Sequence, residues 1–328
     1  MKHIVAKVLS LLLLLSLLLS LFSCAQTPSK DLEIKVYALN GTTALGLAKM
    51  MADRDTDTMN YNISLHASAD TVTAPLLTGE CAIAALPTNV AVKLYHQSEG
   101  KIQLLALNTL GVLYLLQEDG QNISSLSDLK GKTIYLPGSG SNPEYITAAL
   151  LEKAGLVVGT DVILNTTTYQ SPDALQSAMI AGKAPLAVLP EPKVSVVTAQ
   201  AKNITTALDL TQEWESMFGP NTLVQGCLVV NTAFAKAHPA EITQFLADYK
   251  ASVEFVKSGS DEAIDAIVKE SILPKAAIAK KALPNCNLCY FAGEDMKNVM
   301  NAFCEAIYAH NPASIKAMPD DGFYYVAS

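Results

Sequence analysis

Short runs of apolar residues alternate along the chain with longer stretches in which apolar residues recur at helical spacing. This alternation is typical of a sheet rich in parallel strands that is flanked by helices. The apolar runs predict strands at residues 33–39, 62–67, 81–86, 102–108, 112–117, 133–136, 162–168, 184–189 and 222–230. The pattern therefore predicts an α/β fold.

Prolines mark the starts of several predicted helices. Asn142 and Ser171, both of residue types that cap helices, are each followed by a proline, which suits the first helical position. His238 also precedes a proline and opens a longer helical pattern that runs to about residue 258. These signals place helices between the predicted strands.

The chain is expected to cross between two lobes. The predicted strands 102–108 and 112–117 lie almost end to end, and the gap between them is too short for a crossover helix. The run at 222–230 would bring the chain back. Lobe 1 would then comprise residues 31–109 and 224–328, and lobe 2 residues 110–223. Two consecutive domains are the alternative, but residues 241–328 have an almost wholly helical pattern and would lack a sheet of their own.

Residues 1–23 have the pattern of a secretory signal peptide. Lys2 and Lys7 precede an apolar run that is shorter than the about 20 residues a membrane-spanning helix needs. Cys24 follows Leu-Phe-Ser, and this tetrad resembles the bacterial lipobox, in which the cysteine receives a lipid and becomes the first residue after cleavage. We therefore predict a lipid anchor at Cys24 and a short polar tether at 24–30. An uncleaved membrane anchor is the alternative.

Composition narrows the possible partners. The chain has 31 Asp and Glu against 23 Lys and Arg, for a net charge of −8. An acidic chain without clusters of basic residues has no footprint for phosphate backbones, which excludes nucleic acid as a partner. Half of the residues are hydrophobic, which excludes a disordered chain. We expect a monomer on the outer face of the bacterial cell membrane.

The cysteines other than Cys24 are odd in number, so they cannot all pair; they are Cys81, Cys227, Cys286, Cys289 and Cys304. Cys81 and Cys227 lie in apolar runs and are expected to be buried. A zinc site could be drawn from the three C-terminal cysteines and His310, but their spacing is irregular and Cys304 falls on the apolar face of a helix. We therefore expect neither a metal nor a cofactor.

The candidates for ligand binding are the residues that follow the predicted strands. Ligands of open α/β sheets lie beyond the carboxyl ends of the strands, where helix N-termini point at them. Nearly all of these residues are small, hydroxylated or amide residues, as they also are in ordinary turns. The candidates are Asn40, Gly41, Thr42, Thr43, Ser68, Thr88, Asn89, Gly138, Ser139, Gly140, Ser141, Tyr169 and Glu191.

The segment from Gly138 to Ser141 is the most specific of these candidates. Its glycines let the backbone close on an anion or a polar group at a helix N-terminus. The phosphate loop of nucleotide-binding proteins is absent, and Gly-x-Gly alone is weak evidence for a dinucleotide.

The residue types near the predicted site bear on the charge of the ligand. Arg54 is the only arginine and is expected on an exposed helix end, so no guanidinium is available to grip a carboxylate in two places. An anion would be held by amides, hydroxyls and helix dipoles. A neutral or aromatic ligand would stack on Tyr169, and a cationic one would also use Glu191.

A histidine and two aromatic residues lie near the predicted strand ends and crossings. His66 closes a predicted strand beside Ser68 and could face the ligand, or it could be a histidine satisfied within the fold. Trp214 and Phe218 lie near the predicted return crossing, where they would pack at the hinge.

The Gly-x-Ser-x-Gly and His-Glu-x-x-His motifs are absent from the sequence, and we expect no catalytic residues and no enzyme. A surface enzyme or a ligand-sensing lipoprotein on the same scaffold stays open, because a fold alone does not separate these functions.

Three segments carry a resemblance to a known family: residues 74–95, 127–156 and 171–197. They resemble the ABC-importer solute-binding proteins of the nitrate, alkanesulfonate and thiamine-pyrimidine-precursor group. The phrase Asp128-Leu-Lys-Gly-Lys-Thr is the most specific part, and it marks the broad superfamily of two-lobed binding proteins. The likeness covers most of residues 31–258.

The resemblance implies a type II periplasmic-binding-protein-like fold, with two lobes joined by two crossover strands. A small-molecule solute would lie between the lobes, and closure would form the shape that the permease and ATPase subunits of the importer recognise. Carried over by position, the binding residues would be Asn40 to Thr43, Thr88, Asn89, Gly138 to Ser141 and Glu191. The chain lacks an arginine or histidine pattern that would assign nitrate or sulfonate, so the resemblance leaves the solute class open.

Overall fold

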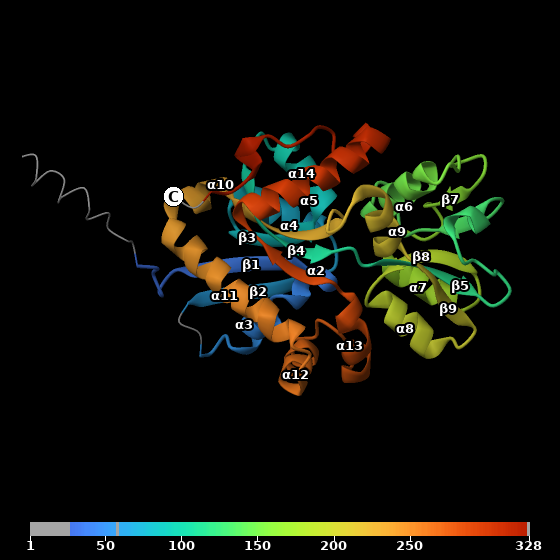
Figure 1. Cartoon of the computed structure of the whole chain (residues 1–328). Helices are drawn as coiled ribbons and strands as arrows, with labels where there is room; N and C mark the ends of the chain where they lie inside the picture. The colour runs from blue at the N-terminus through green and yellow to red at the C-terminus, as the bar shows by residue number, and fades with distance from the viewer. Residues whose placement is uncertain (1–26, 57–58, 327–328) are drawn as a thin grey trace, which may run out of the picture.

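Two β-sheets, each flanked by helices, lie side by side in the computed structural model, which describes residues 27–56 and 59–326 (Figure 1). The sheet of lobe 1 has six strands in the order β11-β4-β10-β3-β1-β2. Its strands are β1 (Glu33–Leu39), β2 (Asn60–His66), β3 (Ile83–Pro87), β4 (Ile102–Leu110), β10 (Val224–Asn231) and β11 (Leu288–Phe291). This sheet draws on two stretches of the chain that are far apart in sequence.

The sheet of lobe 2 has five strands in the order β7-β6-β8-β5-β9. They are β5 (Leu113–Glu118), β6 (Thr133–Tyr135), β7 (Ile163–Asn165), β8 (Leu186–Pro190) and β9 (Ile204–Asp209). The two-lobed α/β fold expected from the sequence is therefore confirmed. The lobe boundaries remain a prediction.

The sheets are more mixed than the parallel-rich sheet predicted from the sequence. β1 runs parallel to β2 and β3, and β6 runs parallel to β7 and β8. In contrast, β10 is antiparallel to β3 and β4, and β5 is antiparallel to β8 and β9. Two of the strands next to the lobe crossings, β5 and β10, thus run against the direction of the parallel strands, whereas β4 runs in the same direction as β3. The pattern of apolar residues in the sequence predicts that a strand exists but does not predict its direction in the sheet.

Two strands were missed by the sequence analysis. β9 carries Thr205 and Thr206, which are exposed, so it has no continuous apolar run. β11 has four residues within a region predicted to be helical, and it pairs with β4 at the edge of the sheet. Residues 241–328 therefore contribute one strand to the sheet of lobe 1 and, as expected, do not form a sheet of their own.

The helices cover both faces of each sheet. In lobe 1, α4 and α5 lie on the same side as α14, and α2, α3 and α11 lie on the other (Figure 1). In lobe 2, α6 and α9 lie on one side, and α7 and α8 on the other. The bounds are α2 (Thr42–Leu45), α3 (Ala48–Ala52), α4 (Asp70–Thr78), α5 (Thr88–Gln97), α6 (Asn142–Lys153), α7 (Pro172–Ile180), α8 (Lys193–Gln200), α9 (Leu210–Phe218), α10 (Thr232–Ala237), α11 (Pro239–Lys257), α12 (Asp261–Lys269), α13 (Ala276–Ala282) and α14 (Gly293–His310).

The helix starts agree with the sequence signals, with one shift. Ser171 caps α7 by accepting a hydrogen bond from Ala174 N at 3.2 Å, and α11 begins at the residue after His238. For α6 the cap is Ser141, so Asn142 is the first residue within the helix. The shift moves the Asn142 side chain from the predicted capping position into the first helical turn.

The predicted strand at 162–168 ends early. Asn165 Oδ1 accepts hydrogen bonds from Thr167 N at 3.3 Å and from Thr168 N at 3.1 Å. An asparagine that bonds to the backbone two and three residues on forms a turn and competes with the sheet ladder. β7 therefore stops at Asn165.

The chain crosses between the lobes at two places. β4 leads through Gly111 and Val112 directly into β5, and the segment after α9 leads back into β10. Gln225 ties the two crossings together, because its Oε1 accepts a hydrogen bond from Val112 N at 2.7 Å. Trp214 of α9 lies at the return crossing, fully buried, with its ring 6.0 Å from that of Phe303 of α14. Trp214 therefore packs beside the return crossing, and its role at a hinge remains a prediction.

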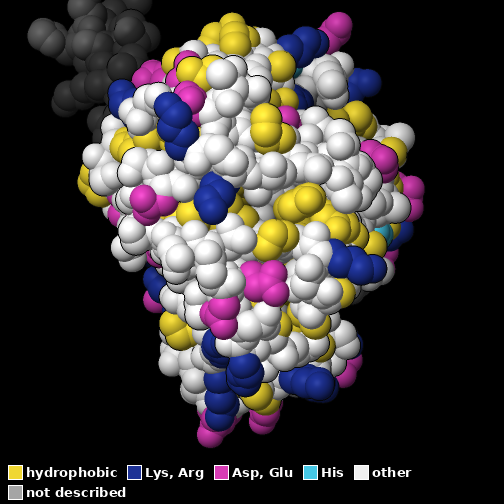
Figure 2. Space-filling model, turned by 90° about the vertical axis from the view of Figure 1, so that its right-hand side faces the viewer, with side chains coloured by type: hydrophobic (Ala, Val, Ile, Leu, Met, Phe, Trp, Pro, Cys, Tyr) yellow, Lys and Arg dark blue, Asp and Glu magenta, His cyan; other side chains and the backbone are white. Residues whose placement is uncertain are grey.

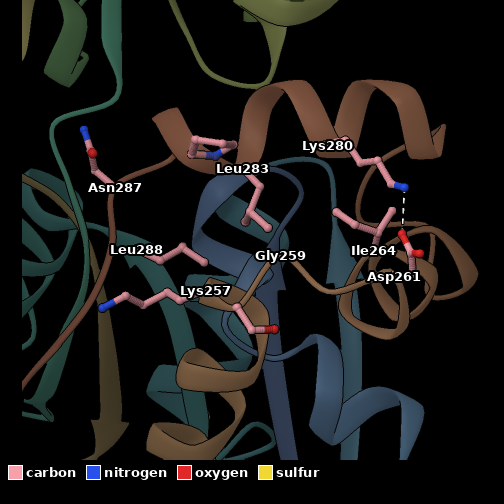
Figure 3. Close-up of a pocket in the computed structure, with 10 residues that line it drawn as sticks. Lys257, Gly259, Asp261, Ile264, Lys280, Leu283, Asn287 and Leu288 are labelled. Carbon is pink, nitrogen blue, oxygen red and sulfur yellow. Dashed lines mark hydrogen bonds and ion pairs between the residues drawn. The ribbon is translucent and has the colours of Figure 1, made fainter.

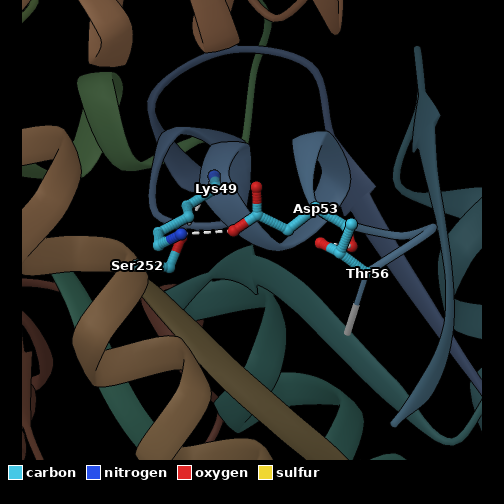
Figure 4. Close-up of polar contacts among 4 residues, drawn as sticks. All are labelled: Lys49, Asp53, Thr56 and Ser252. Atoms are coloured by element: carbon cyan, nitrogen blue, oxygen red, sulfur yellow. Dashed lines mark hydrogen bonds and ion pairs between the residues drawn. The ribbon is translucent and has the colours of Figure 1, made fainter. Parts of the chain in front are cut away.

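A polar anchor fastens α3 to the long helix α11 (Figure 4). Ser252 Oγ of α11 is buried and accepts a hydrogen bond from Lys49 N at 3.3 Å. The Lys49 ammonium pairs with the Asp53 carboxylate one turn later, and Asp53 O accepts a hydrogen bond from Thr56 Oγ1 at 3.0 Å. The Ser252 contact thus serves the start of α3, whose N-cap residue Leu47 makes no side-chain hydrogen bond, and the Asp53 contacts lie at its C-terminal end.

All of the cysteines within the described residues are free and buried. Burial raises the pKa of Cys81 and of Cys289 to about 12, and it raises the pKa of Cys227, Cys286 and Cys304 as well. Because a thiol reacts as its thiolate, these cysteines are inert packing residues at neutral pH.

The predicted signal peptide and the lipidation residue Cys24 lie outside the described residues. Within residues 27–56 and 59–326, none of the helices combines the length and the apolar character that crossing a bilayer requires.

Candidate functional site

The predicted residues of lobe 1 gather at one edge of its sheet. β1, β2 and β3 are parallel, so the residues that follow them lie at the same edge. Asn40 follows β1 and its N–H donates to His66 O, at the end of β2, over 2.9 Å. Thr88 and Asn89 begin α5 directly after β3.

Thr42 and Thr43 begin the short helix α2 beyond Gly41, whose φ of 117° favours glycine. Thr43 Oγ1 donates to Leu39 O at 3.1 Å, and Thr43 O accepts a hydrogen bond from the buried side chain of Asn108 at 3.2 Å. Asn108 belongs to β4, so the crossing strand itself positions this loop. Sequence analysis missed Asn108, because it lies inside an apolar run.

The predicted residues of lobe 2 gather in the same way. Gly138 to Ser141 follow β6, Tyr169 follows β7, and Glu191 follows β8. Gly138 N donates to Tyr169 O at 3.0 Å, and a Cβ at position 138 would lie 3.1 Å from Gln170 O. With φ values of 77° and 73°, Gly138 and Gly140 form the tight loop that the sequence predicted at the start of α6.

The two sets meet where the starts of α5 and α6 touch. Asn89 Nδ2 donates to Gly140 O at 3.3 Å, and Asn142 Nδ2 donates to Thr88 Oγ1 at 3.3 Å. Lys93 Nζ lies 5.1 Å from the centre of the Tyr145 ring. We call this contact the α5–α6 seam; its residues are Thr88, Asn89, Lys93, Gly140, Asn142 and Tyr145. The seam brings the glycine loop of one lobe against the strand tips of the other.

Burial shapes the electrostatics of the seam. Thr88, Asn89 and Asn142 are almost fully buried. Burial lowers the pKa of Lys93, an effect that the nearby Glu144 carboxylate opposes. Lys93 and Asn142 are not recognisable as site residues from the sequence, because Lys93 lies within a helix and Asn142 has the residue type and position of a helix cap.

Glu191 lies at a second contact between the lobes. The residue is 3% exposed, and its carboxylate accepts hydrogen bonds from Ser195 N at 3.1 Å and Ser195 Oγ at 2.9 Å in the first turn of α8. Burial raises the pKa of Glu191, opposed by the Ser195 hydrogen bonds and by the charge of Lys281. Lys281 belongs to α13 of lobe 1, and its Nζ donates to Thr198 Oγ1 of α8 at 2.6 Å. Glu191 therefore has a structural partner in its own lobe and a charged neighbour in the other.

Three predicted residues make local contacts instead of joining the seam. His66 stacks on Tyr37 with ring centres 4.4 Å apart, and its Nε2 lies 2.9 Å from Ser64 Oγ. Ser68 is exposed in the turn before α4. Tyr169 packs on Tyr135 with ring centres 5.6 Å apart. Arg54 pairs with Glu270, on the exposed position expected for it.

Two pockets of about 590 Å³ lie outside the predicted site. The first is in lobe 1, between the end of α11, the start of α12 and α13, with Leu283 and Leu288 near its centre and the Lys280–Asp261 ion pair at one end (Figure 3). The second lies between α6 and the end of α14, and its lining includes Val157 and Val158. Both valines are exposed. The face of the molecule at the lobe 2 end shows scattered apolar side chains among charges of both signs (Figure 2). Neither pocket is lined by a predicted site residue.

The C-terminal cysteines and His310 are distributed over several elements: Cys286 follows α13, Cys289 lies in β11, and Cys304 and His310 lie in α14. His310 is on α14, the helix that also carries Cys304, and it is paired with Glu152 of α6 in the other lobe. The described part of the chain contains no group of three or more His, Cys, Asp or Glu residues that could hold a metal ion.

Comparisons with known proteins agree with the resemblance in the sequence. Residues 102–263, just under half of the chain, match the family described as NMT1/THI5 like. The sequence matches no curated protein.

Solved structures share the fold over nearly the whole chain. An ABC transporter protein from Parabacteroides distasonis is 24% identical, with a TM-score of 0.75 over 91% of this chain and 100% of that one. The periplasmic aliphatic sulphonate binding protein SsuA from Escherichia coli is 14% identical, with a TM-score of 0.72 over 90% and 92%. The alkanesulfonate-binding protein SsuA from Xanthomonas axonopodis pv. citri, bound to MOPS, is 16% identical, with a TM-score of 0.66 over 89% and 97%. These similarities confirm the periplasmic-binding-protein-like fold, and the neighbours are described as binding and transport proteins.

Proposed function

We propose that this chain is the extracytoplasmic solute-binding component of an ABC importer, which holds a small molecule between its two lobes. The observation that carries the proposal is the α5–α6 seam. There, strand tips of both sheets, rich in hydroxyl, amide and backbone groups, meet across two chain crossings. Ligands of open α/β sheets bind at such strand tips.

The proposed mechanism is closure stabilised by the solute. Rotation about the two crossings would separate and rejoin the seam, whose direct hydrogen bonds between the lobes are few and weak. A solute that contacts both lobes binds the closed form better, and this difference in affinity is what shifts the equilibrium. The permease and ATPase subunits would recognise the closed form.

Binding without turnover is the expected result for the purified mature protein. A screen of sulfonates, oxyanions, vitamins and pyrimidines by thermal unfolding should find a class of solute that stabilises the protein. At 100 times the dissociation constant, the stabilisation is about 2.7 kcal/mol. Calorimetry should give one site per chain, and the solute should be recovered unchanged. Conversion of the solute into a product would show instead that the protein is an enzyme.

The proposed lipid anchor is supported by the Leu-Phe-Ser-Cys tetrad that ends the apolar run of the signal peptide. Cells expressing the full chain should incorporate labelled palmitate into it, and the Cys24→Ala variant should lose at least nine-tenths of the label. A Cys81→Ala variant is the matched control, because Cys81 is a buried thiol within the fold. Palmitate labelling that persists in the Cys24→Ala variant would contradict a lipid anchor at Cys24.

A further inference from the structure

The glycine loop at the start of α6 already holds a carboxylate, and it comes from the chain itself. Glu144 Oε2 accepts a hydrogen bond from Gly140 N at 2.5 Å and one from Ser139 Oγ at 3.3 Å. Glu144 is the third residue of α6, so its side chain folds back over the helix start. The anion position that the loop offers is therefore occupied.

Glu144 also compensates the positive end of the α6 dipole. α6 has twelve residues, its cap residue Ser141 makes no side-chain hydrogen bond to the helix, and Glu144 is the acidic residue of its first turn. An acidic side chain at this position satisfies the dipole that would otherwise attract an anionic ligand. The Lys93 ammonium across the seam interacts with the same carboxylate. The pair leaves no excess positive charge to balance a second anion.

A buried acceptor without a partner lies next to this loop. Asn142 is 5% exposed, and its Oδ1 is buried and has no hydrogen-bond partner. The hydroxyl proton of Thr88 is donated to Val224 O at 2.8 Å, so Thr88 Oγ1 can only accept from the Asn142 amide. This fixes Nδ2 toward Thr88 and leaves Oδ1 as the free end of the amide.

A buried acceptor with no donor is unfavourable, since it has lost its water without gaining a hydrogen bond. A solute with an N–H or O–H group at the seam would supply the missing donor. A fully ionised sulfonate or sulfate has only acceptors, and it would meet both Asn142 Oδ1 and the Glu144 carboxylate.

We infer that the solute of this chain is neutral or cationic and donates a hydrogen bond to Asn142 Oδ1 at the α5–α6 seam, and that Glu144 excludes oxyanions from the glycine loop. The inference rests on the proposed solute-binding function. It separates this chain from the neighbours described as sulphonate binding proteins. It also agrees with the position of Arg54, which is exposed and paired with Glu270.

The test compares ethanesulfonate and sulfate binding in the wild type and in Glu144 variants, measured by calorimetry and thermal unfolding at fixed ionic strength. Glu144→Gln removes the charge, and Glu144→Ala also empties the loop. The matched control is Glu152→Gln, on the same helix but outside the loop, with its carboxylate paired to His310. The wild type and the control should show no saturable binding, and Glu144→Ala should bind at least one of the two anions at least tenfold more tightly than the wild type.

Wild-type protein that binds ethanesulfonate or sulfate at one site per chain would overturn the inference and leave the proposed function intact. Glu144 variants that gain no affinity for either anion would overturn the exclusion by Glu144. A screen in which no solute of any class binds the wild type would instead contradict the proposed function, and the gain of anion binding in Glu144→Ala would still be measurable. For a solute that does bind, Asn142→Leu should weaken binding at least tenfold, and unchanged affinity would refute the assigned donor contact.

Discussion

Replacing Trp214 by alanine is expected to lower the free energy of unfolding by about 3–5 kcal/mol, the range for deleting a large buried aromatic side chain. Trp214 is fully buried in α9 of lobe 2. Its ring stacks on Phe218 at 4.2 Å between centres and lies 6.0 Å from the Phe303 ring of α14 in lobe 1. Its Nε1 donates to Thr222 Oγ1 at 3.0 Å, which holds the segment that leads back into β10. The variant therefore loses the packing of the indole ring against Phe218 and Phe303 and leaves a cavity between the two lobes.

Guanidinium unfolding followed by far-ultraviolet circular dichroism measures this loss, because the variant lacks the only tryptophan of the chain. Trp214→Phe is the control: it keeps an aromatic ring against Phe218 and Phe303 and gives up only the Thr222 hydrogen bond and part of the volume. It should lose clearly less stability than Trp214→Ala. Equal losses in both variants would mean that the hydrogen bond, and not the packing between lobes, carries the effect.

Replacing Gly226 by alanine is expected to destabilise the protein by about 1–3 kcal/mol, as overpacking of a tight interior does. A Cβ at position 226 of β10 would lie 2.5 Å from Asn108 Oδ1 and 2.8 Å from Thr109 Oγ1 of β4. Both side chains are buried, and Asn108 Nδ2 donates to Thr43 O. Relief of the clash must move the crossing strand or the loop that Asn108 positions. We therefore expect weaker solute binding together with the lower stability.

Gly120→Ala is the matched control for this variant. Gly120 has a φ of 91°, and a Cβ added there would have no atom within 4 Å. Alanine at this position would therefore strain the backbone without causing a clash. The free energy of unfolding of Gly120→Ala should fall by about 1–2 kcal/mol with unchanged solute affinity. A Gly226→Ala variant that binds solute as well as Gly120→Ala does would show that the crossing can shift without disturbing the Thr43 loop.

Much of the fold followed from local chemistry. The apolar run at residues 33–39 became β1 with the same bounds, and Ser171 followed by proline became the capped start of α7. These predictions hold because a strand buried on one face and a capped helix leave their marks within a few residues. The short strands β9 and β11 have no local sequence pattern that predicts them, because they are placed in the sheets by pairing with strands distant in sequence.

The candidate site divides in the same way. The sequence alone shows which loops follow strands and that these loops consist of small and polar residues, because strand ends and turns are local properties. The contact of Gly140 with Asn89, the position of Glu144 in the glycine loop and the lack of a donor for Asn142 Oδ1 follow from the packing of the two lobes. Each of these facts depends on where a side chain points once two lobes are brought together, and a pattern along one chain carries no such information.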